Sequence, residues 1–82
     1  MMISMACDLP ACLRAYYQDG DVFALYADGR EVRFAISANR RLRGQPEEKL
    51  NHIEIGHFGL SWPDLDEDLS HAGLRAGRFG QP

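Results

Sequence analysis

The chain has 82 residues, of which 45% are hydrophobic and 26% are charged, and its formal net charge is −3 at pH 7. This length predicts one small domain with a thin core, and the composition excludes a wholly disordered chain, a collagen-like repeat and a coiled coil. No apolar run approaches the roughly 18 residues of a membrane-spanning helix, and the acidic balance provides no overall positive field to hold nucleic acid.

The N-terminal residues 1–10 carry no clear strand or helix signal, and we interpret them as a flexible segment. Cys7 and Cys12 are too few for the disulfide framework of a small secreted domain, so we expect reduced thiols and a cytoplasmic location. The three histidines stand at no zinc-like spacing from these cysteines. The sequence therefore predicts neither a metal site nor a cofactor.

Two turn signals divide the next part of the chain into three expected strands. The first, 12–17, is followed by the polar turn 18–21, and the second, 22–27, is followed by Asp28-Gly29. An Asp-Gly pair between two strand-like runs is typical of a two-residue hairpin loop. The third strand extends to Ile36, and the three together form an antiparallel meander.

A two-residue loop fixes the expected register of the second and third strands. It pairs Leu25 with Val32 and Phe23 with Phe34, which places these four side chains on one face of the sheet. We predict that this face is the core. The opposite face, which we expect to meet water or a partner, carries Ala24, Tyr26, Glu31 and Arg33.

Short segments separated by polar connections follow the meander. Residues 37–44 contain three arginines and read as a solvated connection. Residues 45–50 predict a short helix, because proline suits the first helical position and acidic side chains suit the N-terminal end. The alternating runs 53–55 and 60–62 flank a glycine-containing turn and predict a second hairpin, which ends at Pro63 because proline cannot donate to a ladder.

The last part of the chain is an acidic turn followed by a helical segment. Ser70 is the expected N-cap, and Gly77 is placed to stop the helix after Ala76. Leu65, Leu69 and Leu74 are expected to fasten this tail to the sheet. The residues with predicted structural roles are Asp28, Gly29, Trp62, Pro63, Leu65, Asp66, Asp68, Leu69, Gly73, Leu74 and Gly77.

These elements predict a single α+β domain over residues 11–80, followed by the tail 81–82. We expect an antiparallel sheet of about five short strands, made of the three-stranded meander and the second hairpin. One or two short helical segments complete the fold.

Three parts of the sequence resemble the small bacterial family catalogued as domain of unknown function 2442. They are the Asp28-Gly29 hairpin, the Gly-x-Pro-Glu-Glu-x-Leu segment 44–50, and the block from 59 to 80, with Trp62 to Gly77 as its most specific part. The resemblance covers about residues 12–80 and implies a compact α+β domain without established catalytic residues. Some members precede a helix-turn-helix domain, and others lie beside a partner family catalogued as domain of unknown function 4160, as in toxin and antitoxin pairs.

The acidic turn is the one segment whose spacing suggests a metal. Asp64, Asp66 and Asp68 occupy the first, third and fifth positions of a calcium loop, but Leu69 stands where that loop has glycine and Arg75 where it has glutamate. We interpret the turn as a solvated connection. We also expect that the protein is not an enzyme. A small ligand- or metal-binding domain that uses this turn is the alternative.

We predict a non-enzymatic protein-interaction module, the antitoxin-like or accessory member of a two-gene unit whose neighbour encodes the protein partner. Exposed edge strands in so small a domain also predict a homodimer. The basic cluster Arg40, Arg41 and Arg43 leaves weak nucleic-acid binding as a further alternative. The candidate partner surface comprises Tyr16, Tyr26, Arg33, Arg40, Arg41, Arg43 and Phe58.

Overall fold

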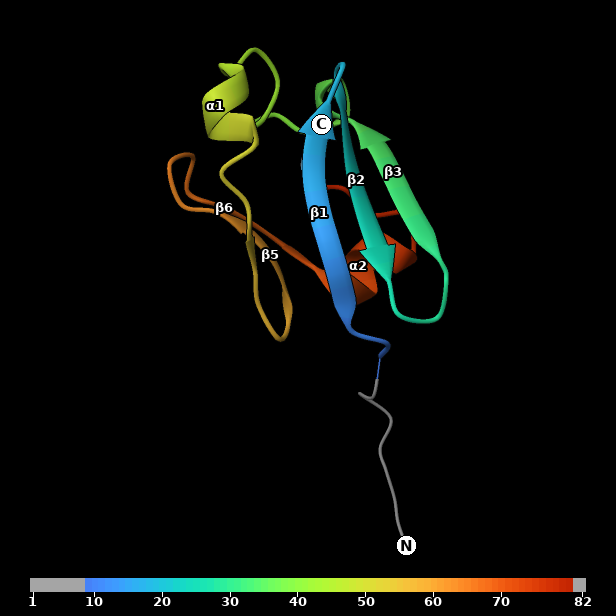
Figure 1. Cartoon of the computed structure of the whole chain (residues 1–82). Helices are drawn as coiled ribbons and strands as arrows, with labels where there is room; N and C mark the ends of the chain where they lie inside the picture. Colours follow the sequence, from blue (N-terminus) through green and yellow to red (C-terminus); the bar gives the residue numbers. More distant parts are fainter. Residues whose placement is uncertain (1–8, 81–82) are drawn as a thin grey trace, which may run out of the picture.

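The first sheet is a three-stranded antiparallel meander in the computed structural model, which describes residues 9–80 (Figure 1). Its strands are β1 (Cys12–Gln18), β2 (Asp21–Tyr26) and β3 (Glu31–Ala35), in that order across the sheet. Asp19 and Gly20 form the two-residue turn between β1 and β2, both with positive φ angles of 51° and 89°. The predicted meander and its first tight turn are confirmed.

Most of the predicted flexible segment 1–10 lies outside the described residues, as do Cys7 and the tail 81–82. Within 9–80, no helix is long and apolar enough to cross a membrane.

The predicted register of the hairpin formed by β2 and β3 is wrong by one residue. The Tyr26 amide donates to the Arg30 carbonyl, and the Gly29 amide donates to the Tyr26 carbonyl, both at 2.9 Å. The loop therefore has three residues, with Gly29 at a φ of +88°, and Ala24 pairs with Val32. Because side chains alternate along a strand, this slip turns every side chain of β2 to the opposite face from the one expected.

The connection after β3 is less solvated than predicted. It contains a 3₁₀ turn, η1 (Ile36–Ala38), followed by Asn39 and Leu42, whose side chains are fully buried. The predicted short helix is present as α1 (Glu47–Leu50), with Pro46 at the N-cap position. Leu42 and Leu50 thus anchor an otherwise polar connection in the core.

The second sheet contains the predicted hairpin and one further strand. β4 (Glu54–Ile55) pairs with β5 (Gly59–Trp62), which ends before Pro63 as expected. The other partner of β5 is β6 (Glu67–Ser70), with Leu69 opposite Leu60. The α+β class with antiparallel strands is confirmed, but six strands form two sheets where about five in one sheet were predicted.

The C-terminal helix α2 (His71–Arg75) begins after Ser70 as predicted and ends one residue earlier than predicted, with Ala76 at its C-cap. The Ser70 hydroxyl accepts a hydrogen bond from the Gly73 amide at 2.9 Å, and Gly77 follows the helix with a φ of +86°. A side chain at position 73 would meet the Ser70 Oγ, so glycine keeps the capped turn tight.

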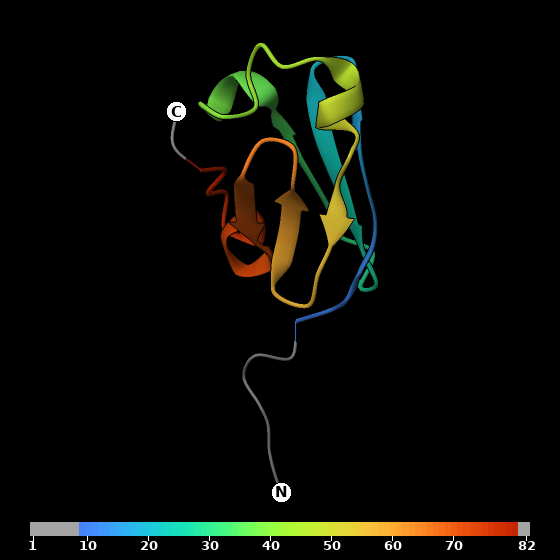
Figure 2. The same cartoon turned by 90° about the vertical axis from the view of Figure 1, so that its left-hand side faces the viewer.

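The core lies between the two sheets, which Figure 2 shows one in front of the other. Trp62 is fully buried, and its indole Nε1 donates to the Leu50 carbonyl at 3.0 Å. Leu65 and Phe79, which belong to no strand, also pack against this core. The buried hydrophobic residues are Val22, Ala24, Tyr26, Val32, Phe34, Leu42, Leu50, Leu60, Trp62, Leu69 and Leu74.

Candidate functional site

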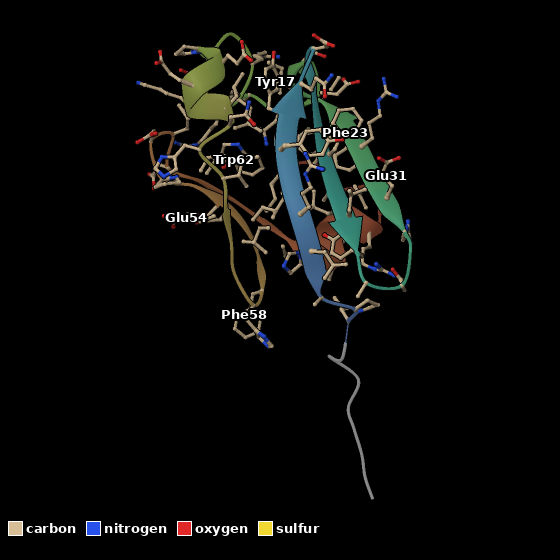
Figure 3. All side chains as sticks on the ribbon, viewed as in Figure 1. Tyr17, Phe23, Glu31, Glu54, Phe58 and Trp62 are labelled. Atoms are coloured by element: carbon tan, nitrogen blue, oxygen red, sulfur yellow. The ribbon has the colours of Figure 1, made fainter. Side chains whose placement is uncertain are left out.

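The outer face of the first sheet points away from the core and carries a mixed aromatic and charged surface (Figure 3). Tyr16 lies opposite Phe23, and Phe23 lies opposite Arg33, so these side chains form a row across the three strands. Leu25, half-buried, follows Phe23 on the same face. The whole outer face comprises Arg14, Tyr16, Gln18, Asp21, Phe23, Leu25, Glu31, Arg33 and Ala35.

Four of these residues form what we call the aromatic–arginine cluster: Arg14, Tyr16, Phe23 and Arg33. The rings of Tyr16 and Phe23 stack with centroids 5.0 Å apart and planes inclined by 14°. The Arg14 guanidinium lies over the Tyr16 ring at 4.6 Å, and that of Arg33 lies over the Phe23 ring at 5.3 Å. Each cation–π contact at an exposed site contributes about 0.5–1 kcal/mol, so the cluster holds its own side chains in place.

An ion pair fixes one end of the cluster. Arg33 Nε and Nη2 both lie 2.8 Å from Asp21 Oδ2, on the neighbouring strand. Arg14, at the other end, makes no ion pair with any residue in the described part of the chain. The cluster therefore presents one neutralised and one uncompensated guanidinium beside two stacked rings.

Tyr26, predicted to lie on the partner surface, is instead buried in the core. Its hydroxyl hydrogen-bonds with His71 Nδ1 at 3.0 Å, and burial raises the pKa of Tyr26 to about 12. His71 Nε2 lies 2.9 Å from the Gly56 carbonyl, which can only accept, so Nε2 carries a proton; in the neutral tautomer Nδ1 then accepts from the Tyr26 hydroxyl. The register slip places Tyr26 in this internal chain of hydrogen bonds.

Asp28 has a structural role beyond its turn. Its Oδ1 accepts from the Arg30 amide at 3.1 Å, and its Oδ2 lies 2.7 Å from Arg75 Nη2 in α2. The hydrogen bond from Arg75 lowers the pKa of the Asp28 carboxyl. Arg30 Nη2 donates in turn to the Arg75 carbonyl at 2.6 Å. The β2–β3 loop is thereby attached to the end of the C-terminal helix.

The other predicted partner residues lie apart from the aromatic–arginine cluster. Arg40, Arg41 and Arg43 are exposed on the connection between η1 and α1. Phe58 is 81% exposed in the β4–β5 turn (Figure 3). Of the predicted partner surface, the structure brings together Tyr16 and Arg33 only.

The β4–β5 turn forms a second apolar region. Phe58 and Ile55 flank two hollows of ≈ 600 and ≈ 470 Å³. Burial raises the pKa of the Cys12 thiol, which borders the smaller hollow. The apolar lining of that hollow includes Leu9, Pro10, Cys12, Ile55, Phe58 and Ala72.

The acidic turn is solvated, as the sequence suggests. Asp64, Asp66 and Asp68 are exposed, and Asp64 Oδ2 lies 2.8 Å from His52 Nδ1. This hydrogen bond raises the pKa of His52. Across residues 9–80, no three His, Cys, Asp or Glu side chains gather in a way that could hold a metal ion.

Comparison with known proteins places this geometry in a family. The family model described as "Protein of unknown function (DUF2442)" matches residues 13–80. The chain belongs to the DUF2442 family. This confirms the resemblance drawn from the Asp28-Gly29 loop and the Trp62 to Gly77 block.

Two solved structures resemble this DUF2442 domain. A crystal structure of a protein of unknown function from Rhodospirillum rubrum is 32% identical, with a TM-score of 0.77 over 90% of this chain and 94% of that chain. A solution NMR structure of an uncharacterized protein from Chromobacterium violaceum is 29% identical, with a TM-score of 0.71 over 83% of this chain and 66% of that chain. None of the curated proteins matches the chain.

Sequence reasoning missed Arg14, Phe23 and Leu25 as members of the outer face. The run Val22 to Tyr26 is apolar on both faces, so its alternation did not reveal which side faces the core. The available signal was the Asp-Gly pair itself, since a three-residue loop with glycine in the left-handed region is the next most common hairpin connection. Weighing that loop would have placed Phe23 opposite Arg33.

Proposed function

We propose that this DUF2442 domain is a non-enzymatic protein-interaction module that recognises another protein through the outer face of its first sheet. The aromatic–arginine cluster is the observation that carries the proposal. Tyr, Phe and Arg are enriched in protein interfaces, and Tyr and Arg dominate the few residues that supply most of the binding energy. Because the cluster already orders its side chains, binding costs less rotamer entropy than it would for free side chains.

The arrangement of the rings favours a protein partner over nucleic acid on this face. The rings of Tyr16 and Phe23 stack on each other, and each also has a guanidinium over it. A base could stack here only by displacing one of these contacts, whereas a protein surface can pack against the ring edges and Leu25. An acidic group on the partner would complement Arg14.

The family resemblance supplies the kind of partner that we propose. Relatives that lie beside a domain of unknown function 4160 suggest an antitoxin-like or accessory role in a bacterial two-gene unit, with the partner encoded next to this chain. We place the pair in the cytoplasm, where a free thiol such as that of Cys12 stays reduced.

Co-expression with the product of the adjacent reading frame tests this proposal. The two chains should co-purify in a stoichiometric complex. The variant Tyr16→Ala should raise the dissociation constant by about 30-fold or more, the effect of a hot-spot residue. Arg43→Ala, an exposed change on the connection between η1 and α1, is the matched control and should leave affinity within about threefold of the wild-type value.

Two results would overturn the assignment. A wild-type chain that elutes free of its neighbour after co-expression removes the protein partner. The second is a complex whose affinity is unchanged by Tyr16→Ala but lowered by Arg43→Ala and lowered further at high salt. That result would place binding on the arginine-rich connection 40–43.

A further inference from the structure

Within residues 9–80, the backbone of β3 has an outer edge without hydrogen-bonding partners. Tyr26 bonds to Arg30 at one end of the β2–β3 ladder and Ile36 bonds to Gly20 at the other. Antiparallel bonds alternate, so Val32 and Phe34 bond to β2, while Glu31, Arg33 and Ala35 direct their amides and carbonyls away from the sheet. Figure 1 shows β3 at the margin of the fold with no other element beside it.

The opposite edge of the same sheet, formed by β1, is closed at Tyr17. The Tyr17 amide donates to Asn51 Oδ1 at 2.9 Å, and Asn51 Nδ2 donates to the Tyr17 carbonyl at 3.1 Å. The Asn51 side chain thus occupies the position that an added strand would take against β1. Among residues 9–80, β3 is therefore the edge strand that is available over its whole length to another strand.

The charges on β3 select one way of pairing it with itself. Glu31, Arg33 and Ala35 direct backbone groups outward, so a two-fold axis can pass through any residue from Glu31 to Ala35. The axes at Phe34 and Ala35 place no opposite charges across from each other. The axis at Glu31 places two carboxylates opposite each other, and the axis at Arg33 does the same with two guanidinium groups. The axis at Val32 instead places each Glu31 opposite an Arg33, twice.

We propose that a second copy of this chain docks on β3 in antiparallel orientation, with each Glu31 facing the Arg33 of the other copy. Arg33 uses Nε and Nη2 for Asp21, which leaves Nη1 for the incoming carboxylate. Glu31 is exposed and makes no ion pair within residues 9–80. The dimer joins the outer faces of the first sheets of the two copies into one continuous surface. Its formation does not require the protein partner of the proposed function.

Charge reversal combined with analytical ultracentrifugation tests this register. The wild-type chain should sediment as a dimer at about 100 μM, following mass action. Glu31→Arg and Arg33→Glu should each be monomers, because each places like charges opposite one another. An equal mixture of the two variants should form a heterodimer, since all cross-strand pairs are then complementary. Glu48→Arg, an exposed change on α1, is the control and should remain dimeric.

Several outcomes contradict the proposal. These are a monomeric wild-type chain at about 100 μM, single variants that still dimerise, and a folded mixture that stays monomeric. Circular dichroism checks the fold of Arg33→Glu, which also loses its contacts with Asp21 and Phe23. If that variant unfolds, Glu31→Arg decides alone, because it leaves the aromatic–arginine cluster intact. Arg14→Ala should leave the dimer unchanged while weakening the foreign partner, which separates this proposal from the proposed function.

Discussion

The side chains of Asn39 and Glu67, 28 positions apart, are joined by a hydrogen bond of 2.7 Å from Nδ2 to Oε2. The same Nδ2 donates to the Phe79 carbonyl at 2.8 Å, and Asn39 Oδ1 accepts from the Arg41 and Leu42 amides. A fully buried asparagine therefore links the connection after β3 to β6 and to the segment that follows α2.

Removing this amide should destabilise the fold strongly. Asn39→Ala leaves buried donors and acceptors without partners, and we expect it to lower the free energy of unfolding by about 2–4 kcal/mol. Arg40→Ala, next to it but exposed, should change it by less than about 0.5 kcal/mol. Urea midpoints at constant m-value give both numbers. Similar losses for the two variants would show that the Asn39 network contributes little.

The core and the acidic turn should respond differently to substitution. Trp62→Ala and Leu69→Ala should each lower the free energy of unfolding by about 2–5 kcal/mol, because both side chains are buried. Asp66→Asn and Asp68→Asn should cost less than about 1 kcal/mol, since both are exposed and asparagine tolerates the φ of +54° at position 66. If the asparagine variants melt as early as the alanine variants, the turn is not a simple solvated connection.

A close backbone approach makes Gly59 sensitive to any side chain. A Cβ at this position would collide with the backbone carbonyl of Leu69 on β6. We expect Gly59→Ala to destabilise the domain by about 2 kcal/mol or more, because the neighbouring strand must move. Gly56→Ala is the control, since its Cβ would lie 3.4 Å from the Gly59 carbonyl oxygen and needs only a small adjustment. Thermal unfolding that is unchanged in Gly59→Ala would contradict the tight β5–β6 pairing.

The pair formed by His52 and Asp64 should give a measurable titration. The hydrogen bond to Asp64 raises the pKa of His52, so the pair stabilises the fold below pH 6.5 and this contribution is lost as pH rises through the raised pKa. NMR titration should show His52 titrating above 6.5, and Asp64→Asn should bring it back toward that value. An unchanged titration in Asp64→Asn would show that the pair does not form in solution.

Much of the fold follows from local signals in the sequence. The turn at Asp19-Gly20, the strand end at Pro63 and the cap at Ser70 each depend on a residue type with one favoured backbone role. Strand β6 was missed because Glu67 to Ser70 contains one apolar residue and no alternation. Its pairing with β5 is a tertiary effect that no local pattern reports.

The candidate site was harder to predict because it depends on register. Tyr16 and Arg33 were expected at a surface, and both are there, but Phe23 was assigned to the core and Tyr26 to the surface. A shift of one residue exchanges those two assignments. The burial of Asn39 could not be predicted either, because an asparagine within an arginine-rich connection is expected to be solvated.

The most direct test of recognition through the outer face is an NMR titration of the isotopically labelled chain with its purified neighbour-encoded partner. We predict that the largest amide and ring perturbations fall on Arg14, Tyr16 and Phe23, with little change at Phe58 or along the basic connection. Perturbations centred on Phe58 or on Arg40 to Arg43, with the aromatic–arginine cluster unaffected, would contradict the account.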